Sequence, residues 1–135
     1  MLQSLKVKNY ALISDVDMHF DEGMNIITGE TGAGKSILIG ALGLALGNRA
    51  DTSSLRNKED KCVIEATFDV QGYDLEHIFN ENDLDYEPQT ILRREITNSG
   101  KSRSFINDTP TNLKALNQLG QRLPVSTKWG RRNYL

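Results

Sequence analysis

A glycine-rich segment at residues 29–36 constrains this chain more than any other feature. It reads Gly-Glu-Thr-Gly-Ala-Gly-Lys-Ser and matches the pattern G-x-x-x-x-G-K-[ST] at every fixed position. Glycines adopt backbone angles closed to other residues, so successive N–H groups can turn inward around a phosphate. An apolar run at 24–28 predicts a buried strand before the segment, and residues 36–46 predict a helix after it. The pattern and its context therefore predict a phosphate-binding loop.

Each residue type in this loop suits phosphate chemistry. Lys35, the predicted catalytic residue, supplies a mobile positive charge for the phosphates, and the Ser36 hydroxyl is a hard oxygen ligand for Mg²⁺. The helix that begins near Lys35 points its positive end at the same place. The order of the glycines, G-x-x-G-x-G, disfavours a dinucleotide-binding Rossmann loop. The alternative to a phosphate-binding loop is a chance match in an ordinary glycine-rich turn. The predicted binding residues are Gly29, Glu30, Thr31, Gly32, Ala33, Gly34, Lys35 and Ser36.

Hydrophobic periodicity predicts an α/β fold around this loop. Alternation of apolar and polar residues over 2–10 and 13–20 predicts a pair of antiparallel strands. In the helix at 36–46, Gly40 and Gly43 indicate that a neighbouring strand approaches closely. The remaining predicted elements are strands at 61–70, 90–97 and 102–107, one or two helical turns within 74–82, a helix end at 47–48, and a helix at 112–121 capped by Thr111.

Composition excludes several classes of protein. With 38% hydrophobic and 25% charged residues, the chain is typical of globular domains. Its longest uncharged stretch has 13 residues, fewer than the ~20 that a membrane span needs, and no secretory signal opens the chain. A lone cysteine, Cys62, excludes an intramolecular disulfide and, with two distant histidines, disfavours a zinc site. These features predict a cytoplasmic protein without a membrane partner.

The charge is unevenly distributed along the chain. Four basic residues and no acidic ones lie in 122–135, so the net charge of −2 corresponds to −6 over residues 1–121. The body is therefore no general binder of polyanions. We assign 1–121 to one incomplete domain and 122–135 to an atypical basic tail, disordered or altered in reading frame. Contact of the tail with nucleic acid is the alternative.

A P-loop hydrolase also needs a carboxylate at the end of a second buried strand and a residue that orients water. One predicted strand ends in a carboxylate, Asp69. The strict alternation of this strand suits a half-exposed position, so we assign Asp69 to the surface. The chain is thus predicted to hold the phosphate cradle without the rest of the catalytic machinery.

Four stretches resemble the RecN family of bacterial DNA repair proteins, within the structural-maintenance-of-chromosomes (SMC) and Rad50-like group of ABC-type ATPases. They are residues 5–13, 23–37, 41–51 (ending Arg-Ala-Asp) and 100–107, and the resemblance covers about residues 1–122. It implies the N-terminal lobe of a split ATPase head, with an antiparallel β-subdomain beside the P-loop strand and helix. ATP and Mg²⁺ are the implied cofactors, and recombinational repair of DNA double-strand breaks is the implied function, near the nucleoid.

The resemblance also implies partners and further site residues. The C-terminal lobe of the same protein brings the signature motif and the Walker B acidic pair, a second head completes a homodimer, and the full-length protein holds DNA. By the same likeness Asn9 and Tyr10 lie near the nucleotide edge, and Arg56 resembles the arginine that follows the P-loop helix. A strand-end turn and a solvated arginine are the alternatives for these residues.

The sequence departs from the family after Leu123, where relatives continue into a glutamine-bearing loop that helps to place Mg²⁺ and water. This departure makes hydrolysis by the chain alone doubtful. Two other functions stay open: a non-catalytic nucleotide-binding module that docks a partner, and a stand-alone P-loop kinase or GTPase. The second is disfavoured because no second carboxylate strand, lid arginines or guanine-reading Asn-Lys-x-Asp segment is visible.

Overall fold

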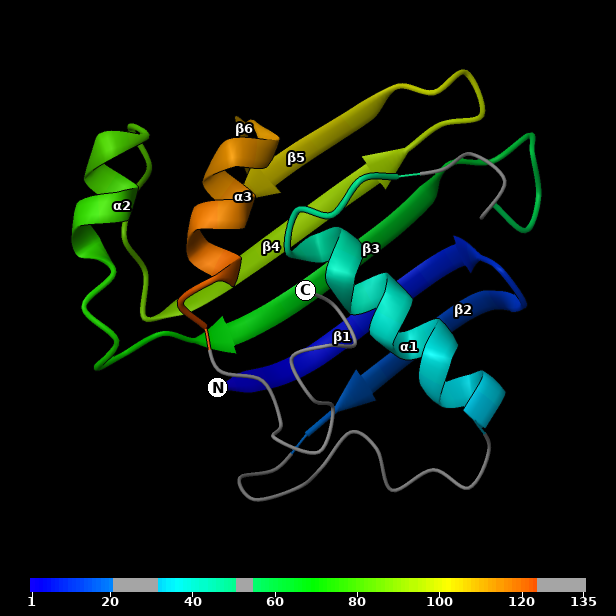
Figure 1. The fold of residues 1–135 in the computed structure, drawn as a ribbon, viewed down its shortest axis with the longest axis horizontal. Coiled ribbons are helices and arrows are strands. Elements are labelled where there is room, and N and C mark those ends of the chain that lie inside the picture. Colours follow the sequence, from blue (N-terminus) through cyan, green and yellow to red (C-terminus); the bar gives the residue numbers. More distant parts are fainter. Residues whose placement is uncertain (21–31, 51–54, 124–135) are drawn as a thin grey trace.

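The computed structural model describes residues 1–20, 32–50 and 55–123, with the backbone alone for 32–35. Figure 1 shows the described elements. In chain order they are β1 (Leu2–Tyr10), β2 (Ile13–His19), α1 (Gly32–Ala45), β3 (Cys62–Asp69), α2 (Glu76–Glu81), β4 (Gln89–Ile96), β5 (Ser102–Ile106), β6 (Thr109–Thr111) and α3 (Leu113–Gly120). The predicted strand at 24–28 lies outside the described residues.

The strands form one six-stranded sheet in the order β2-β1-β3-β4-β5-β6, with every neighbouring pair antiparallel. This arrangement confirms the α/β class, the antiparallel sheet and each alternating segment predicted as a strand. The short helix predicted within 74–82 is confirmed as α2. Among the helices that the structure describes, none is long and apolar enough to cross a bilayer.

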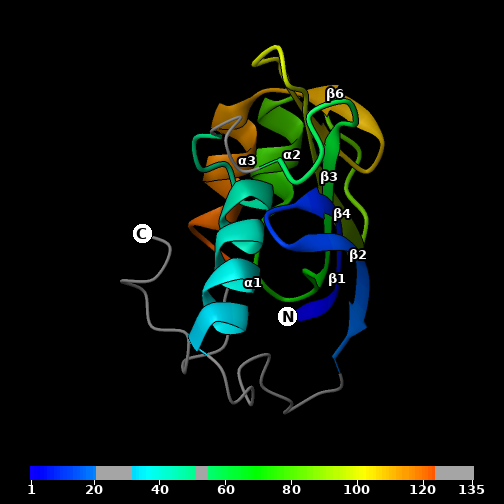
Figure 2. The same ribbon diagram turned by 90° about the vertical axis from the view of Figure 1, so that its right-hand side faces the viewer.

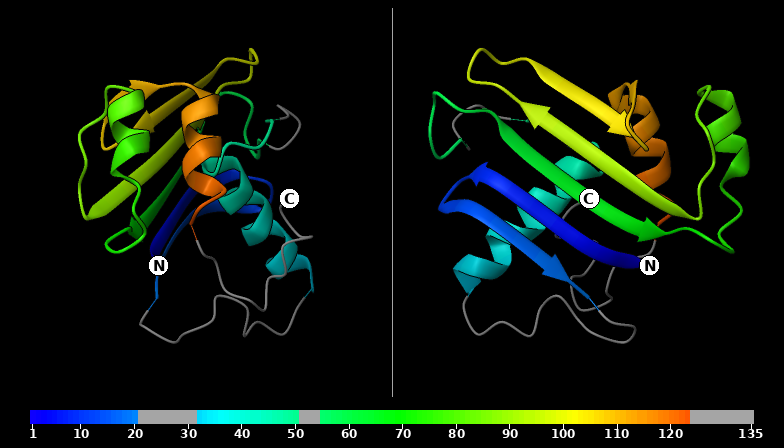
Figure 3. Two further views of the ribbon diagram at one scale, coloured as in Figure 1. Left: turned by 60° about the vertical axis from the view of Figure 1, so that its left-hand side comes forward. Right: turned by 180° about the vertical axis from the view of Figure 1, so that it is seen from behind.

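The described helices all lie on one face of the sheet, and none of them covers the other, here called the uncovered face (Figures 2 and 3). Strand β3 shows why, because its residues alternate strictly between buried and partly exposed. Its buried residues Cys62, Ile64, Ala66 and Phe68 face the helices, in register with Leu92 and Ile96 of β4. Each large apolar side chain buried in this way contributes about 1.5–3 kcal/mol. The core therefore lies between the sheet and α1, α2 and α3.

Helix α1 begins at Gly32, four residues before the predicted start at Ser36, so the C-terminal half of the glycine-rich segment belongs to the helix. A Cβ atom on Gly40 would lie 2.5 Å from the hydroxyl oxygen of Tyr10 in β1. The close approach predicted at Gly40 is thus confirmed, and it is made by a side chain of the neighbouring strand.

The end of α1 packs against α3 through two glycines. Gly47 has a φ of +103°, and a Cβ atom there would lie 2.7 Å from Oδ1 of Asn117 and 3.0 Å from its backbone nitrogen. A Cβ atom on Gly120 would lie 2.9 Å from the carbonyl oxygen of Leu46. The Asn48 N–H donates to Gly43 O at 2.9 Å and closes the last turn. The helix end predicted at 47–48 is confirmed, and it is a fixed junction.

We expect Gly47→Ala to lower the free energy of unfolding by about 3 kcal/mol. A positive φ costs a residue with a side chain about 1–2 kcal/mol, and the contact with Asn117 adds to it. Gly100→Ala is the matched control, because Gly100 has a φ of +88° with nothing within 4 Å of its Cβ position. Urea unfolding of both variants measures the difference, and equal losses would contradict the close junction.

Two details near the C-terminal end differ from the sequence predictions. Asn112, not Thr111, is the N-cap of α3, since its side-chain oxygen accepts from the Ala115 N–H at 2.9 Å. Thr111 instead ends β6, a strand that was not predicted and that pairs with β5. The turn between these strands contains Asn107 and Asp108, with φ values of 51° and 67°. Positive values at both central positions are typical of a two-residue type I′ hairpin.

Candidate phosphate-binding site

The predicted phosphate-binding residues lead directly into α1. Gly29, Glu30 and Thr31 lie outside the described residues, whereas Gly32, Ala33, Gly34, Lys35 and Ser36 are the first positions of the helix. The first N–H groups of a helix have no intrahelical partner, and the helix dipole places partial positive charge there. The Ser36 side chain is exposed, and no acidic residue lies in the first turn. This helix end has the backbone arrangement that binds anions in other proteins.

Asn9 lies at the end of β1 and holds the loop at 57–60. Its amide nitrogen donates to the carbonyl oxygens of Asn57 and Asp60, each at 2.8 Å, and its side-chain oxygen accepts from the Asn57 N–H at 2.6 Å. The residue is 8% exposed and has a φ of 56°, which asparagine tolerates better than most residues. The side chain is thus committed to the loop, and the contact predicted with the nucleotide edge stays a prediction.

Tyr10 and Arg56, the other two residues carried over by resemblance, are brought close together. Tyr10 pairs with Leu55 in an isolated antiparallel bridge, and the Arg56 N–H donates to the Asn9 carbonyl oxygen at 3.4 Å. The Arg56 side chain is exposed, whereas the Tyr10 ring is half-buried against Gly40 of α1. The end of β1, the chain at 55–56 and the middle of α1 therefore meet at one place.

Arg94 is a buried cation that the sequence analysis did not single out. It lies on β4, is 1% exposed, and donates from Nη1 to the carbonyl oxygens of Leu44 and Asn48, both at 2.8 Å. Its Nε donates to the Ser102 hydroxyl at 2.7 Å. Burial lowers the pKa of the guanidinium, and the neighbouring Cys62 acts in the opposite direction. Its in-phase position between Leu92 and Ile96 is the sequence signal that could have revealed it.

Cys62 lies in the same layer and is an unreactive thiol. It is fully buried at the start of β3. Burial raises the pKa of its thiol from 9.0 to about 11, although the charge of Arg94 acts to lower it. Because the thiolate is the reactive form, Cys62 is a packing residue at neutral pH.

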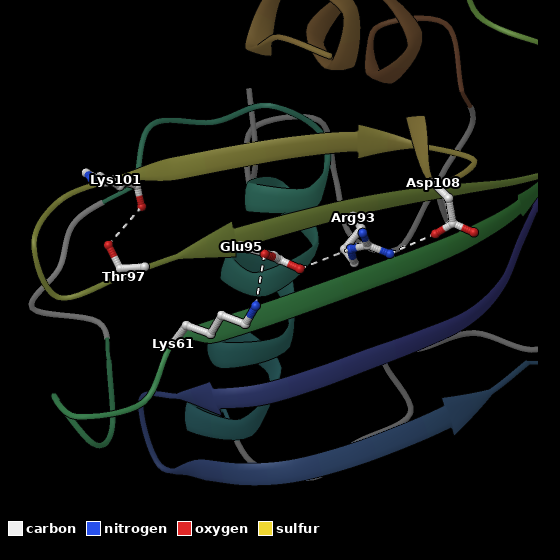
Figure 4. Close-up of polar contacts among 6 residues, drawn as sticks. All are labelled: Lys61, Arg93, Glu95, Thr97, Lys101 and Asp108. Atoms are coloured by element: carbon white, nitrogen blue, oxygen red, sulfur yellow. Dashed lines mark hydrogen bonds and ion pairs between the residues drawn. The ribbon is translucent and has the colours of Figure 1, made fainter. Parts of the chain in front are cut away.

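The uncovered face of the sheet carries alternating charges (Figure 4). Glu95 forms ion pairs with two basic residues. Its Oε1 lies 3.1 Å from Lys61 Nζ, and its Oε2 lies 3.3 Å from Arg93 Nε, a contact without hydrogen-bond geometry. Arg93 also contacts Asp108 at 2.8 Å and covers the Phe105 ring at 4.1 Å. The strand register continues the pattern through Lys6 opposite Asp17 and Glu65, and Lys8 opposite Asp15. The face therefore has no field of a single sign.

Asp69 is the last residue of β3, and its carboxylate accepts from the turn that follows. Its Oδ1 accepts from the Gln71 N–H at 3.0 Å, and its carbonyl oxygen accepts from the amino group of Met1 at 2.6 Å. The residue is partly exposed. In this position its carboxylate organises the chain after β3.

The fold is similar to that of SMC heads and of part of RecF. An SMC ATPase, solved in a study of ATP-driven dimerization and DNA-stimulated activation, superposes with a TM-score of 0.69 at 16% identity, over 96% of this chain and 83% of that one. The recombination mediator protein RecF, solved as RecF-ATPrS, gives a TM-score of 0.63 at 17% identity over 86% of this chain and 29% of that one. These similarities show the fold.

Sequence comparison gives the family. A protein-family model described as an AAA domain matches residues 4–133, and the chain belongs to this family. Its sequence is also similar to part of the DNA repair protein RecN, with curated RecN proteins matching at 31–44% identity. The DNA repair protein RecN of Vibrio cholerae is 44% identical over 124 residues, which cover 91% of this chain and 22% of that protein. The chain therefore spans about a fifth of the length of this relative.

Proposed function

We propose that the chain is the ATP-binding lobe of a RecN-type ATPase head that acts in recombinational repair of DNA double-strand breaks. The observation that carries the proposal is the complete P-loop pattern at 29–36, which runs into the first turns of α1 in an ATPase-head fold. A match in sequence alone recurs by chance, but here the helix begins within the motif. The family relationship to RecN supports the same function.

In this proposal the N–H groups at the start of α1 bind the β- and γ-phosphates of ATP. Lys35 adds a positive charge to the same phosphates, and the Ser36 hydroxyl is a ligand of the Mg²⁺ that accompanies the nucleotide. Mg²⁺, when bound, would neutralise charge on the phosphates. The exposed position of Ser36 supports this role, because a ligand of Mg²⁺ must be accessible to the nucleotide.

The proposed partners follow from the part of the relatives that this chain spans. A lobe of about a fifth of the relative's length binds one side of the nucleotide, and the C-terminal lobe, a second head and DNA are assigned to the whole protein. The related SMC ATPase was solved in work on ATP-driven dimerization and DNA-stimulated activation, which supports a dimer that works on DNA. We place this activity in the cytoplasm, at the nucleoid.

Titration of the chain with Mg-ATP, followed through backbone amide chemical shifts, tests the proposal. We expect the largest shifts at residues 32–36, and Lys35→Ala should weaken binding about tenfold or more, since a charge-assisted hydrogen bond contributes about 1.5–3 kcal/mol. Lys114→Ala is the matched control, because Lys114 is an exposed lysine of α3. Shifts that spare 32–36, or equal affinities for the two variants, would refute the phosphate site.

A further inference from the structure

The buried guanidinium of Arg94 holds the end of α1 that lies opposite the phosphate-binding residues. The carbonyl groups of the last helical turn have no intrahelical partners, and the helix dipole makes this end negative. Arg94 binds at this end, with Nη1 at 2.8 Å from the carbonyl oxygens of Leu44, in the last turn, and of Asn48, in the segment that follows the helix. The Leu44 oxygen also accepts from the Gly47 N–H at 3.1 Å. The Nε atom of Arg94 is fixed in turn by the hydroxyl of Ser102 on β5. One side chain therefore joins the C-terminal end of α1 to two adjacent strands of the sheet.

We propose that Arg94 is a positioning residue for the first turn of α1, residues 32–36, and acts through the helix. This inference rests on the proposed function. Arg94 lies at the far end of a helix of 14 residues, which is about 21 Å long at 1.5 Å per residue. A tilt of about 5° at the fixed end would move the other end by roughly 2 Å over that length. In enzymes, misplacing a group by 1 Å can lower the reaction rate about 10²-fold.

The chemistry of the group favours positioning over simple stabilisation. Burying a cation is costly, and a buried ion adds little net stability compared with an apolar residue of similar size. A guanidinium, however, is planar and presents its donors in a rigid fork, so three hydrogen bonds at 2.7–2.8 Å define one place for the helix end. The apolar contacts of Leu42 and Ala45 with the core are less directional.

Further close contacts of α1 lie at its C-terminal end and near its middle. Gly47 abuts Asn117 at that same end, and Gly40 abuts Tyr10 near the middle. Burial is complete at Ala41, Leu42 and Ala45, whereas Ser36 is exposed. Among the α1 side chains that the structure describes, burial therefore increases from Ser36 toward the end held by Arg94.

Amide-detected titrations with Mg-ATP and residual dipolar couplings of α1, both on the 135-residue chain, test the inference. We expect Arg94→Met, which keeps a long apolar stem, to weaken Mg-ATP binding about tenfold and to reorient α1 against the sheet. Arg94→Lys should be intermediate, because an ammonium lacks the planar fork. Arg93→Met is the matched control, since the neighbouring Arg93 contacts Glu95 and Asp108 on the uncovered face. It should bind as the wild type does.

Gly100→Ala separates positioning from loss of stability, because it destabilises the chain in a turn away from α1. Its affinity in the folded state should equal that of the wild type. If Arg94→Met binds Mg-ATP normally, or if its α1 keeps the wild-type orientation, the inference is wrong and the proposed function stands. If the wild type itself does not bind, the proposed function fails and the inference falls with it. Should Arg94→Met not fold, Arg94→Lys decides by the same two measurements.

Discussion

The 135-residue chain alone will release phosphate from ATP at close to the uncatalysed rate, even where it binds the nucleotide. Its sequence offers N–H donors and Lys35 for the phosphates. Asp69, the carboxylate at the end of β3, accepts from the Gln71 N–H in the turn that follows the strand. Groups that stabilise charge in the transition state are each worth up to about 10³–10⁵ in rate. We therefore expect turnover at least about 10³-fold below that of an intact RecN-type protein.

Steady-state phosphate release from the purified chain, measured beside an intact relative such as the Vibrio cholerae protein, checks this expectation. Lys35→Ala is the control for contaminating ATPase, because any residual activity that survives it does not come from the P-loop. Turnover at the rate of the intact protein that is lost in Lys35→Ala would identify the chain as a complete small NTPase.

Asn9→Asp will lower the free energy of unfolding by about 3 kcal/mol at pH 7. The substitution keeps the size of the side chain and its tolerance of positive φ, but it removes the N–H₂ group that donates to Asn57 O and Asp60 O. Both carbonyl oxygens then lose a donor and face a carboxylate in a site that is 8% exposed. Unsatisfied buried polar groups cost about 1–3 kcal/mol each. Urea unfolding at pH 7 measures the loss.

Asn107→Asp is the matched control for this variant. Asn107 also has a positive φ, of 51°, and its side-chain oxygen accepts from the Ile91 N–H at 2.9 Å, a bond that aspartate can keep. Its amide nitrogen makes a longer and exposed contact of 3.4 Å with Asp85 O. We expect a loss below about 1 kcal/mol. Similar losses in both variants would mean that Asn9 does not anchor the loop at 57–60.

The strands were predictable because a strand with one buried face alternates apolar and polar residues along the sequence. In β3 the buried row of Cys62, Ile64, Ala66 and Phe68 alternates with Glu65 and Thr67, and the period of two identifies both the strand and its inner face. The order of the strands was not predictable in the same way. Pairing of β1 with β3 joins residues about 60 positions apart, and no local pattern specifies such a partner.

The two buried polar side chains show where sequence reasoning stopped. Asn9 is in phase with Leu5 and Val7, and Arg94 is in phase with Leu92 and Ile96, so the pattern places both on the inner face. It does not reveal that the end of α1 and the loop at 57–60 supply their hydrogen-bond partners. Those partners are backbone carbonyl groups. Every residue has one, so the residue types do not show which carbonyl group will accept the bond.

Element boundaries differed where short polar residues compete for the same role. Thr111 and Asn112 can both cap a helix. Asn112 is the cap in the structure because Thr111 belongs to β6, where it pairs with Ser104 of β5. β6 itself has three residues with a proline at its centre, which is too short for an alternating pattern. The phosphate-binding residues, in contrast, were predicted from spacing alone, because the motif specifies the residue types that phosphate binding needs, and their role stays a prediction.

Pro110 at the centre of β6 also determines how the sheet ends. In a two-residue hairpin the pair beside the turn, here Ile106 and Thr109, exchanges hydrogen bonds, and the next pair directs its backbone groups outward. That next pair is Phe105 and Pro110, so the outward position of the edge strand lacks an N–H donor. A strand from another molecule would find no ladder to extend there. The edge is thereby protected against polymerisation of one sheet onto the next.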